Sequence, residues 1–510
     1  MRKTLIITAA VFASVLLAVP LVNSKIEQYA RNKLVAALRE RYGSDLDFSR
    51  FDVRVLPSIR VDAEKLAFRH HGRRDVPPLI EIRRLTARAG LLQMFQSPPH
   101  IRRIELDGLV VTVPPRNQNK EEKKAGATRE RTQHSPVVVD EVRCEAAVVR
   151  LLPNKAGKDP LTFDVHRLAM RSVGLDRPAP FTAALNNPTP PGEIHVAGDF
   201  GPWQKDDPGQ TALAATYEFN NADLGHFKGI GGILSSTGKF GGVLERILVD
   251  GETHTPDFSV DAGGHPMPLD TMFHAIVDGT SGDTLLQPVR ARLANSTTII
   301  ANGGVVKTPG KKGRTVALDV TVPEGRLQDV LRLAVKSDKP PMTGGVSFRT
   351  KFDLPPGGGT VAERLRLDGH FGIDSARFTS FNVQEKVATL SKKGRGEPED
   401  DSAADSVVSG LGGRFKLAAG IRSFSGLEFN VPGASVRLNG TYGLLDEALD
   451  FRGNLRLAAK ASETTTGVKS FFLKLVDPFL AKDGAGTVLP IRVGGNRKAP
   501  DFGVALGGAN

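Results

Sequence analysis

Two glycine-rich stretches contain residue types that could hold a phosphate group. Gly229-Ile230-Gly231-Gly232 resembles the start of a dinucleotide-binding turn, but the third glycine and the strongly periodic helix that such a turn needs are both missing. The stretch from Gly232 to Lys239 has one residue too many between its glycines for a phosphate loop, and Phe240 stands where serine or threonine would coordinate magnesium. Neither stretch predicts a nucleotide site.

Residues that could bind metals or attack a substrate are present, but their spacing does not fit such chemistry. His70 and His71 are adjacent, so in a strand they would point to opposite faces and would not share one metal ion. Cys144 lies in an apolar, strand-like context without an identifiable base, and Glu399-Asp400-Asp401 lies in an expected linker. Neither a G-x-S-x-G elbow nor an H-E-x-x-H helix occurs. We therefore expect no enzyme, no metal site and no cofactor.

From about residue 45 onward, apolar and polar residues alternate with the period of two that is typical of strands with one apolar face. Phe51, Val53 and Val55 alternate with charged residues. Later runs, about twenty in all, are separated by Gly, Pro, Asn and Asp. Examples are Ile59, Val61 and Ala63, followed after a slip by Leu66 and Phe68; Ile104 and Leu106; Leu109, Val111 and Val113; Leu161, Phe163 and Val165; and Val316, Leu318, Val320 and Val322. The sequence predicts a mostly β fold with an elongated, curved antiparallel sheet, either groove-like or a sandwich.

A few short helices interrupt this alternation. Ile26, Tyr29, Leu34 and Leu38 recur at helical spacing, and this helix could lie on a membrane surface or, as we favour, close one end of a sheet. Gly325 to Lys336 and Thr466 to Leu480 are two further helix candidates.

Two charged, apolar-poor stretches, Arg116 to Ser135 and Lys392 to Asp405, are expected to be disordered and to separate domains. The sequence is therefore divided into an anchor at 1–23, a helix with a β region at 24–115, a disordered linker at 116–135, a central β domain at 136–390, a second disordered linker at 391–406 and a C-terminal β domain at 407–510.

One pattern occurs twice. Ile247-x-Val249-x-Gly251-x4-Pro256-Asp257-Phe258-x-Val260 recurs with the same spacing from Ile491 to Val504. We interpret each copy as a strand, a turn and a second strand that begins at proline. A repeated β-unit would explain the two copies, and chance similarity between such segments is the alternative.

The N-terminus predicts a membrane anchor. Leu5 to Val22 contains no charged residue and follows Arg2 and Lys3, and as a helix it would rise about 27 Å, close to the thickness of a hydrocarbon core. By the positive-inside rule, the N-terminus stays in the cytoplasm and the rest of the chain is exported. A cleavable signal peptide is the alternative, with a weak cleavage site at Val22-Asn23-Ser24.

The charge of the chain is concentrated next to this segment. Residues 1–150 hold 27 Lys+Arg against 17 Asp+Glu, whereas the remaining residues hold 41 against 39. Anionic lipid head groups would suit such a basic region, and an arginine-rich solvated surface is the other interpretation. The basic stretches lack interleaved aromatic residues, so we expect no nucleic-acid partner.

Several segments together resemble the AsmA-like family of bacterial envelope proteins. In the N-terminal region they are Val53-Arg54-Val55-Leu56-Pro57-Ser58-Ile59-Arg60-Val61, Pro78-Leu79-Ile80-Glu81-Ile82 and Ile104-Glu105-Leu106-Asp107-Gly108. In the C-terminal region they are Phe429-Asn430-Val431-Pro432-Gly433-Ala434, Val436-Arg437-Leu438-Asn439-Gly440-Thr441-Tyr442 and Ile491-Arg492-Val493-Gly494-Gly495. The resemblance makes 24–115 and 407–510 the AsmA-like regions.

The resemblance implies an anchor in the bacterial inner membrane, a body in the periplasm and a role in outer-membrane biogenesis. Larger members of the family look like bridge-type lipid transfer proteins, whose sheets curl into an apolar groove. If this carries over, the residues that contact acyl chains are Val53, Val55, Val61, Phe68, Leu106, Val111 and Val113. The expected function is binding or transfer of membrane phospholipid, with other envelope proteins as further partners. The alternative is a structural or assembly factor for outer-membrane proteins that transfers no lipid.

Overall fold

The fold is described from a computed structural model of the 510-residue chain. It describes residues 46–55, 58–69, 77–90, 93, 98–113, 137–152, 161–174, 177–202, 204, 210–279, 281–308, 310–311, 313–395, 407, 409–443, 448–458, 487–496 and 499–504, with helical residues 28, 29, 32, 35 and 36. The strands among these residues belong to one long sheet, and the helices are few and short. The prediction of a mostly β fold is confirmed.

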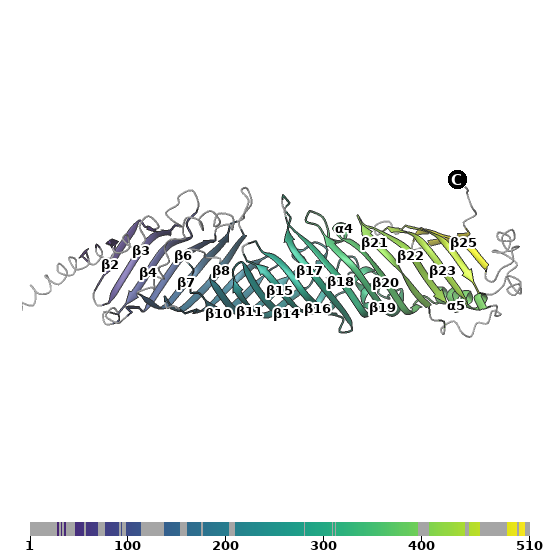
Figure 1. The fold of residues 1–510 in the computed structure, drawn as a ribbon, viewed down its shortest axis with the longest axis horizontal. Helices are drawn as coiled ribbons and strands as arrows, with labels where there is room; N and C mark the ends of the chain where they lie inside the picture. The colour runs from purple at the N-terminus through teal and green to yellow at the C-terminus, as the bar shows by residue number, and fades with distance from the viewer. Residues whose placement is uncertain are drawn as a thin grey trace, which may run out of the picture. The chain divides into compact units, whose positions relative to one another are not determined.

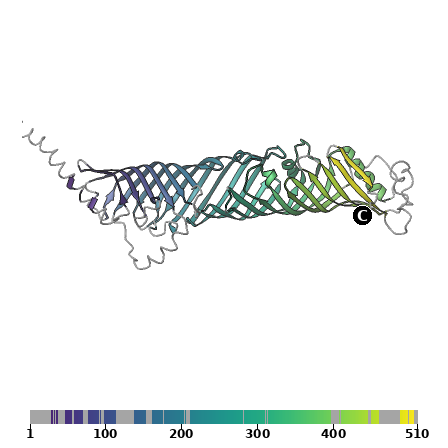
Figure 2. The ribbon, with the colours of Figure 1, turned by 90° about the horizontal axis from the view of Figure 1, so that it is seen from above.

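The chain divides into two compact units. Unit 1 contains residues 1–222, 237–249 and 277–282, and unit 2 contains residues 223–236, 250–276 and 283–510. In each unit the ribbon is a single, curved layer of strands (Figure 1, Figure 2). The strands that contribute residues to both units are β13 (Ile233–Val243), β14 (Arg246–Val260) and β15 (Met267–Asp278), and β11 (Ala212–Asp223) adds its last residue to unit 2.

Strands of unit 1 pair mostly in the order in which they occur in the chain. They are β1 (Leu46–Asp47), β2 (Arg50–Arg54), β3 (Ile59–Phe68), β4 (Ile80–Ala89), β5 (His100–Ile101), β6 (Arg103–Val113), β7 (Val138–Leu151), β8 (Leu161–Val173), β9 (Ala179–Pro188), β10 (Pro191–Phe200) and β11 (Ala212–Asp223). Neighbours from β2 to β11 are antiparallel, except that β7 runs parallel to β5 and β6. A meander of this kind places alternate residues of every strand on the same face.

Unit 2 is built in the same way. Its strands are β12 (Ile230–Gly231), β16 (Asp283–Leu293), β17 (Thr297–Lys307), β18 (Arg314–Arg326), β19 (Met342–Leu354), β20 (Arg366–Phe378), β21 (Ser409–Ala418), β22 (Ile421–Val431), β23 (Ala434–Gly443), β24 (Leu449–Leu457), β25 (Thr487–Asn496) and β26 (Ala499–Val504). Each strand from β16 to β26 is antiparallel to the next one in the chain.

Two helices of unit 2 pack on this sheet. Helix α3 (Leu327–Ala334) confirms the helix expected within Gly325 to Lys336, and its Leu327 is buried beside Val346, Ile373 and Ala376. Helix α5 (Phe381–Arg395) was not predicted, because its apolar positions are few and weakly periodic. A single turn, α4 (Val361–Arg364), and a 3-10 turn, Leu224–His226, are the other helical segments among the described residues of this unit.

Helix α5 corrects part of the expected disorder. Lys392 to Asp405 was expected to be disordered, yet Lys392 to Arg395 form the last turn of this helix. The helix is held there because Ser391 is fully buried and its hydroxyl donates a hydrogen bond of 2.8 Å to the carbonyl oxygen of Pro432. A buried polar anchor therefore outweighs the low apolar content of the segment.

The repeated pattern adopts two different structures. Its second copy forms the expected hairpin, in which β25 pairs with β26 and Gly495 lies opposite Pro500. The first copy was expected to be a hairpin too, but it lies within the single continuous strand β14. Glu252 stands where the second copy has Asn496, and the strand-favouring Thr253 and Thr255 stand where it has Arg497 and Ala499, so the first copy lacks the asparagine that favours a turn directly after its glycine.

Several expectations fall outside the described residues. These are the anchor Leu5 to Val22, the linker 116–135, most of the linker 391–406 and the helix expected at Thr466 to Leu480. Within the described part of the chain, no helix is both long enough and apolar enough to cross a bilayer. Of the expected helix near residue 30, the described positions are helical, and Val35 packs against the apolar cluster of unit 1.

Helix α3 is fixed to strand β17 by a buried polar contact, which gives a test of unit 2. The hydroxyl of Thr297, which is fully buried, donates to a carboxylate oxygen of Asp329 at 2.8 Å and accepts the N–H of Arg326 at 3.0 Å. Thr297→Val should lower the free energy of unfolding of unit 2 by about 1–3 kcal/mol, because it leaves a buried donor and a buried carboxylate undersatisfied. Urea unfolding measures the change. Thr298→Val, on the opposite face of the same strand, is the matched control, and an equal loss in both variants would contradict the assignment.

Candidate functional site

The first part of the candidate site is an apolar face on strands β1 to β9 of unit 1. Its buried members are Leu46, Phe51, Val53, Ala63, Leu66, Ile82, Leu109, Cys144, Ala147 and Val165. Half-buried residues that pack against them include Phe48, Ile80, Leu85, Val149, Leu168, Ala183 and Leu185. We call this surface the apolar face of unit 1.

A line of irregular pairing crosses this face and keeps it apolar. On each of five neighbouring strands, two members of the apolar face stand three positions apart, a spacing that would place them on opposite faces of a regular strand. The pairs are Ala63 and Leu66, Ile82 and Leu85, Leu106 and Leu109, Cys144 and Ala147, and Val165 and Leu168. They lie in register with one another across the sheet. We call this line the bulge seam.

Backbone conformations explain how the strands turn at the bulge seam. Lys65, Gly108 and Ala146 have φ of 53°, 66° and 62°, in the left-handed region. This conformation turns the strand so that the apolar residue that follows again points to the apolar face. At Gly108 a Cβ atom would also come within 2.9 Å of the Cβ of Arg83. The slip that interrupts the alternation before Leu66 is therefore a structural feature of the sheet.

The structure brings the predicted lipid-contacting residues together. Val53 is buried in the cluster, and five others are half-buried and pack against it: Val55, Val61, Phe68, Leu106 and Val111. Val113 ends strand β6, and its side chain lies outside the described residues. Their contact with acyl chains stays a prediction, but the alternation that selected them placed six side chains on one surface.

The apolar face continues onto strands that the sequence analysis did not select. Ile194 pairs with Leu185 and Phe219, and Val196 pairs with Ala183 and Tyr217. Every large apolar side chain on this part of the face is half-buried and none is fully buried: Phe181, Leu185, Ile194, Val196, Phe200, Leu213, Tyr217 and Phe219. The sequence does contain a signal for this part of the face. In Pro191–Phe200, Glu193, His195 and Asp199 alternate with the apolar residues, as in a strand with one apolar face.

Unit 2 carries an apolar face of its own, built from phenylalanine and glycine. The rings of Phe371 and Phe415, of Phe371 and Phe424, and of Phe424 and Phe451 have their centroids 6.1, 6.4 and 5.9 Å apart. Gly440 lies between Phe424 and Phe451, and a Cβ atom there would approach the carbonyl oxygen of Asp450 to 2.1 Å. Glycine thus makes room for aromatic rings on the neighbouring strands.

The helices cover only part of this second face. Helix α3 covers the region of Val346 and Ile373. Helix α5 covers the region where β22 ends and β23 begins, since Val387 and Ala388 pack there against Val431 and Ala434. Phe371 packs against the cluster under α3, whereas the half-buried Phe415 and Phe424 belong to neither cluster.

The opposite face of unit 1 is polar and balanced in charge. Arg83 contacts Asp107 at 2.5 Å, and Glu141 accepts from both Arg103 and Arg143 at 2.7 Å. The hydrogen bond from Arg143, with that from Arg103, lowers the pKa of Glu141 against the opposing effect of desolvation. Ion pairs at an exposed surface add little stability, so this face serves mainly to keep one side of the sheet in water.

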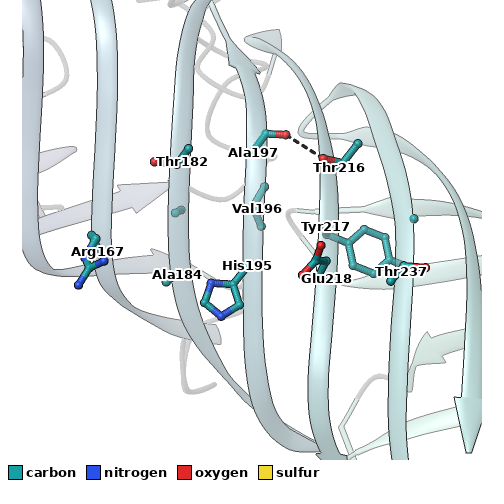
Figure 3. Close-up of a pocket in the computed structure, with 12 residues that line it drawn as sticks. Arg167, Thr182, Ala184, His195, Val196, Ala197, Thr216, Tyr217, Glu218 and Thr237 are labelled. Atoms are coloured by element: carbon teal, nitrogen blue, oxygen red, sulfur yellow. Dashed lines mark hydrogen bonds between the residues drawn. The ribbon is translucent and has the colours of Figure 1, made fainter.

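A hollow lies on this polar face, over strands β8 to β13 of unit 1 (Figure 3). Arg167, His195 and Glu218 line it, together with threonines of β9, β11 and β13. The hydroxyl of Thr216 donates to the carbonyl oxygen of Ala197 at 3.3 Å, and His195 pairs with Glu193 at 3.1 Å. The side chains of Arg167, His195 and Glu218 are exposed to water, and we assign no reaction to them.

Other chemistry-bearing residues do not gather into a site. Among the described residues, no three His, Cys, Asp or Glu side chains lie close enough to hold a metal ion. Cys144 is buried in the apolar face, and burial raises the pKa of its thiol, so it behaves as a small apolar residue. His70 and His71 lie outside the described residues, as does the acidic run at 399–401.

No protein-family model, no curated protein and no solved structure matches this chain. The resemblance to the AsmA-like family therefore stays an expectation from the sequence.

Asp62 gives a test of the polar face of unit 1 through pH. Burial alone raises the pKa of its carboxyl group, but hydrogen bonds from Arg60 and Thr86 outweigh this and hold the pKa below its usual range. Because the folded-state pKa is lowered, Asp62 contributes stability above its unfolded-state pKa and loses it as the pH falls through the folded-state pKa. The stability difference between the wild type and Asp62→Asn should therefore shrink as the pH is lowered from about 7 to about 3.

Urea unfolding of both proteins across this pH range measures the difference. Thr86→Val removes one of the two donors, so the folded-state pKa of Asp62 should rise, the contribution of Asp62 should become smaller, and its loss should be complete at a higher pH than in the wild type. A difference between the wild type and Asp62→Asn that does not change with pH would contradict this account.

Proposed function

We propose that this protein is anchored in the bacterial inner membrane and that its periplasmic sheet binds the acyl chains of phospholipids and transfers them during outer-membrane biogenesis. The proposed location and pathway are supported by the charge-free N-terminal segment and by the AsmA-like resemblance. The binding of acyl chains is supported by the apolar faces of the two units. In this proposal each curved sheet forms a groove whose apolar side is filled by lipid.

One observation carries the proposal: large apolar side chains of the described residues remain half-buried along one face of the sheet. Ile194, Val196, Phe200 and Phe219 are among them. In a closed sandwich, side chains of a second layer would cover such residues. An acyl chain lying on this face would gain about 0.8 kcal/mol for each CH₂ group that it removes from water.

The polar face supports the same proposal. Several of its arginines and carboxylates are paired with one another, so the sheet presents water-compatible groups on one side and hydrocarbon on the other. A protein that only needed rigidity would gain by covering its apolar side, because exposed apolar patches favour aggregation. Phospholipid is an occupant that explains why that side stays open.

Photo-crosslinking in membranes tests whether lipid lies on the apolar face. Benzoylphenylalanine is placed in the full chain at Phe219, which faces the apolar side, and at Glu218, its exposed neighbour on the same strand. Cells grown on radioactive phosphate are then irradiated and the protein is isolated. Labelled lipid should be attached at position 219 and not at position 218.

A second pair of variants tests the residues that the sequence predicted. Val111→Asp with Val55→Asp should abolish labelling at position 219 but leave the strand content by circular dichroism unchanged, because a carboxylate on the groove floor repels hydrocarbon. Val110→Asp, on the opposite face of β6, is the matched control and should leave the labelling intact. Equal labelling at positions 218 and 219, or none at either, would contradict lipid binding, and protein adducts without lipid would favour the assembly factor.

A further inference from the structure

One arginine of unit 2 lies on the apolar side of the sheet. Arg422 is the second residue of β22, where Leu417 of β21 and Tyr442 of β23 are its partners in register. The same row continues to Leu367 of β20 and to Leu449 of β24. Arg422 is therefore the single charged residue in a row of five. The other four side chains are apolar or aromatic, and the row lies near one end of these strands.

The other arginines of these strands behave differently. Those of β20, β21 and β23 to β25 are exposed: Arg366, Arg377, Arg414, Arg437, Arg452, Arg456 and Arg492. Three of them form ion pairs, with Asp353, Glu428 and Asp450. Arg422, in contrast, is partly buried, and among the residues that the structure describes it has no carboxylate partner.

The surroundings of Arg422 disfavour its charge. Desolvation lowers the pKa of its guanidinium, and the phenol of Tyr442 only partly opposes this effect. A cation that is removed from water without an anion is costly, and replacing it with an apolar residue of similar size often stabilises a protein. A leucine would continue the row of Leu367 and Leu417, so stability of the sheet gives no reason for an arginine there.

The next row of the sheet offers a surface for hydrocarbon. It consists of Gly369, Phe415, Phe424, Gly440 and Phe451, in register from β20 to β24. Phe424 is two residues from Arg422 and on the same face of β22. Helix α5 packs at the other end of β22, around Val431, and so leaves this end of the strand uncovered by that helix.

We propose that Arg422 binds the phosphate group of a phospholipid whose acyl chains lie on Phe415, Phe424 and Phe451. The inference rests on the proposed function and adds to it a recognition site in unit 2. A guanidinium can donate two parallel hydrogen bonds to a phosphate. Because Arg422 lies near the end of its strand, a head group bound there can reach water. The anion would supply the charge that the described residues around Arg422 do not.

The test uses the full chain in membranes, with benzoylphenylalanine at position 424 and cells grown on radioactive phosphate. Because benzophenone reacts with C–H bonds, which inorganic phosphate lacks, a labelled adduct reports a lipid and not free phosphate. Arg422→Leu should lower labelling at position 424 by roughly tenfold, the effect of losing charge-assisted hydrogen bonds to a phosphate. Arg422→Lys, which keeps the charge, should retain part of the labelling.

Two controls separate binding from folding. Arg422→Leu should melt at a temperature no lower than that of the wild type, because it replaces an unpaired partly buried charge with an apolar residue. Arg437→Leu removes an exposed arginine of the neighbouring strand and should leave the labelling at position 424 unchanged. If Arg422→Leu lowers the melting temperature substantially, or if it labels as strongly as the wild type, the inference is wrong.

Labelling at position 219 of unit 1 separates this inference from the proposed function. If Arg422→Leu is labelled at position 219 and is also labelled at position 424 as strongly as the wild type, the proposed lipid binding is supported and the role of Arg422 is wrong. When neither position is labelled in the otherwise wild-type chain, the proposed function itself fails. The expected result is labelling at position 219 that persists in Arg422→Leu together with the loss at position 424.

Discussion

The structure depends on one constraint, which is that every strand must keep its apolar side chains on the same side of the sheet. A single layer has no second sheet to hide a residue that faces the wrong way. In unit 1 this constraint is met even where the strands are irregular, because the bulge seam shifts five neighbouring strands together. In unit 2 it is met by pairing phenylalanine with glycine across strands, so that the rings fit side by side.

The same constraint explains why one side of the sheet is polar and the other is apolar. Arg–carboxylate pairs keep the outer side compatible with water, and their net effect on stability is small. The other side holds the clusters of buried apolar residues, and helices α3 and α5 cover parts of it in unit 2. What remains half-buried in each unit is a hydrocarbon-compatible surface, on which the proposed lipid binding depends.

Much of this arrangement could be predicted from the sequence, because strand alternation is a local signal. The runs at Phe51, Val61 and Val111 indicated both the strands and the side that would be apolar, and helix α3 followed from its own spacing. Helix α5 could not be predicted, because its burial depends on contacts with Val431 and Pro432, far along the chain. Arg422 was equally hidden: beside the exposed Ile421, local polarity suggests the reverse orientation, and only the register with Leu417 and Tyr442 reveals which way it faces.

The bulge seam also limits how this protein can change in length. A deletion of one residue within β6 would reverse the side-chain orientation in one half of that strand and would place Leu106 or Leu109 on the polar face. Strands β4 and β7, which pair with β6, have the same irregularity at the same position. A compensating deletion would therefore be needed in both of them as well. Gain or loss of sequence in this region is therefore confined to the connections between strands, while the strands themselves must vary by substitution alone.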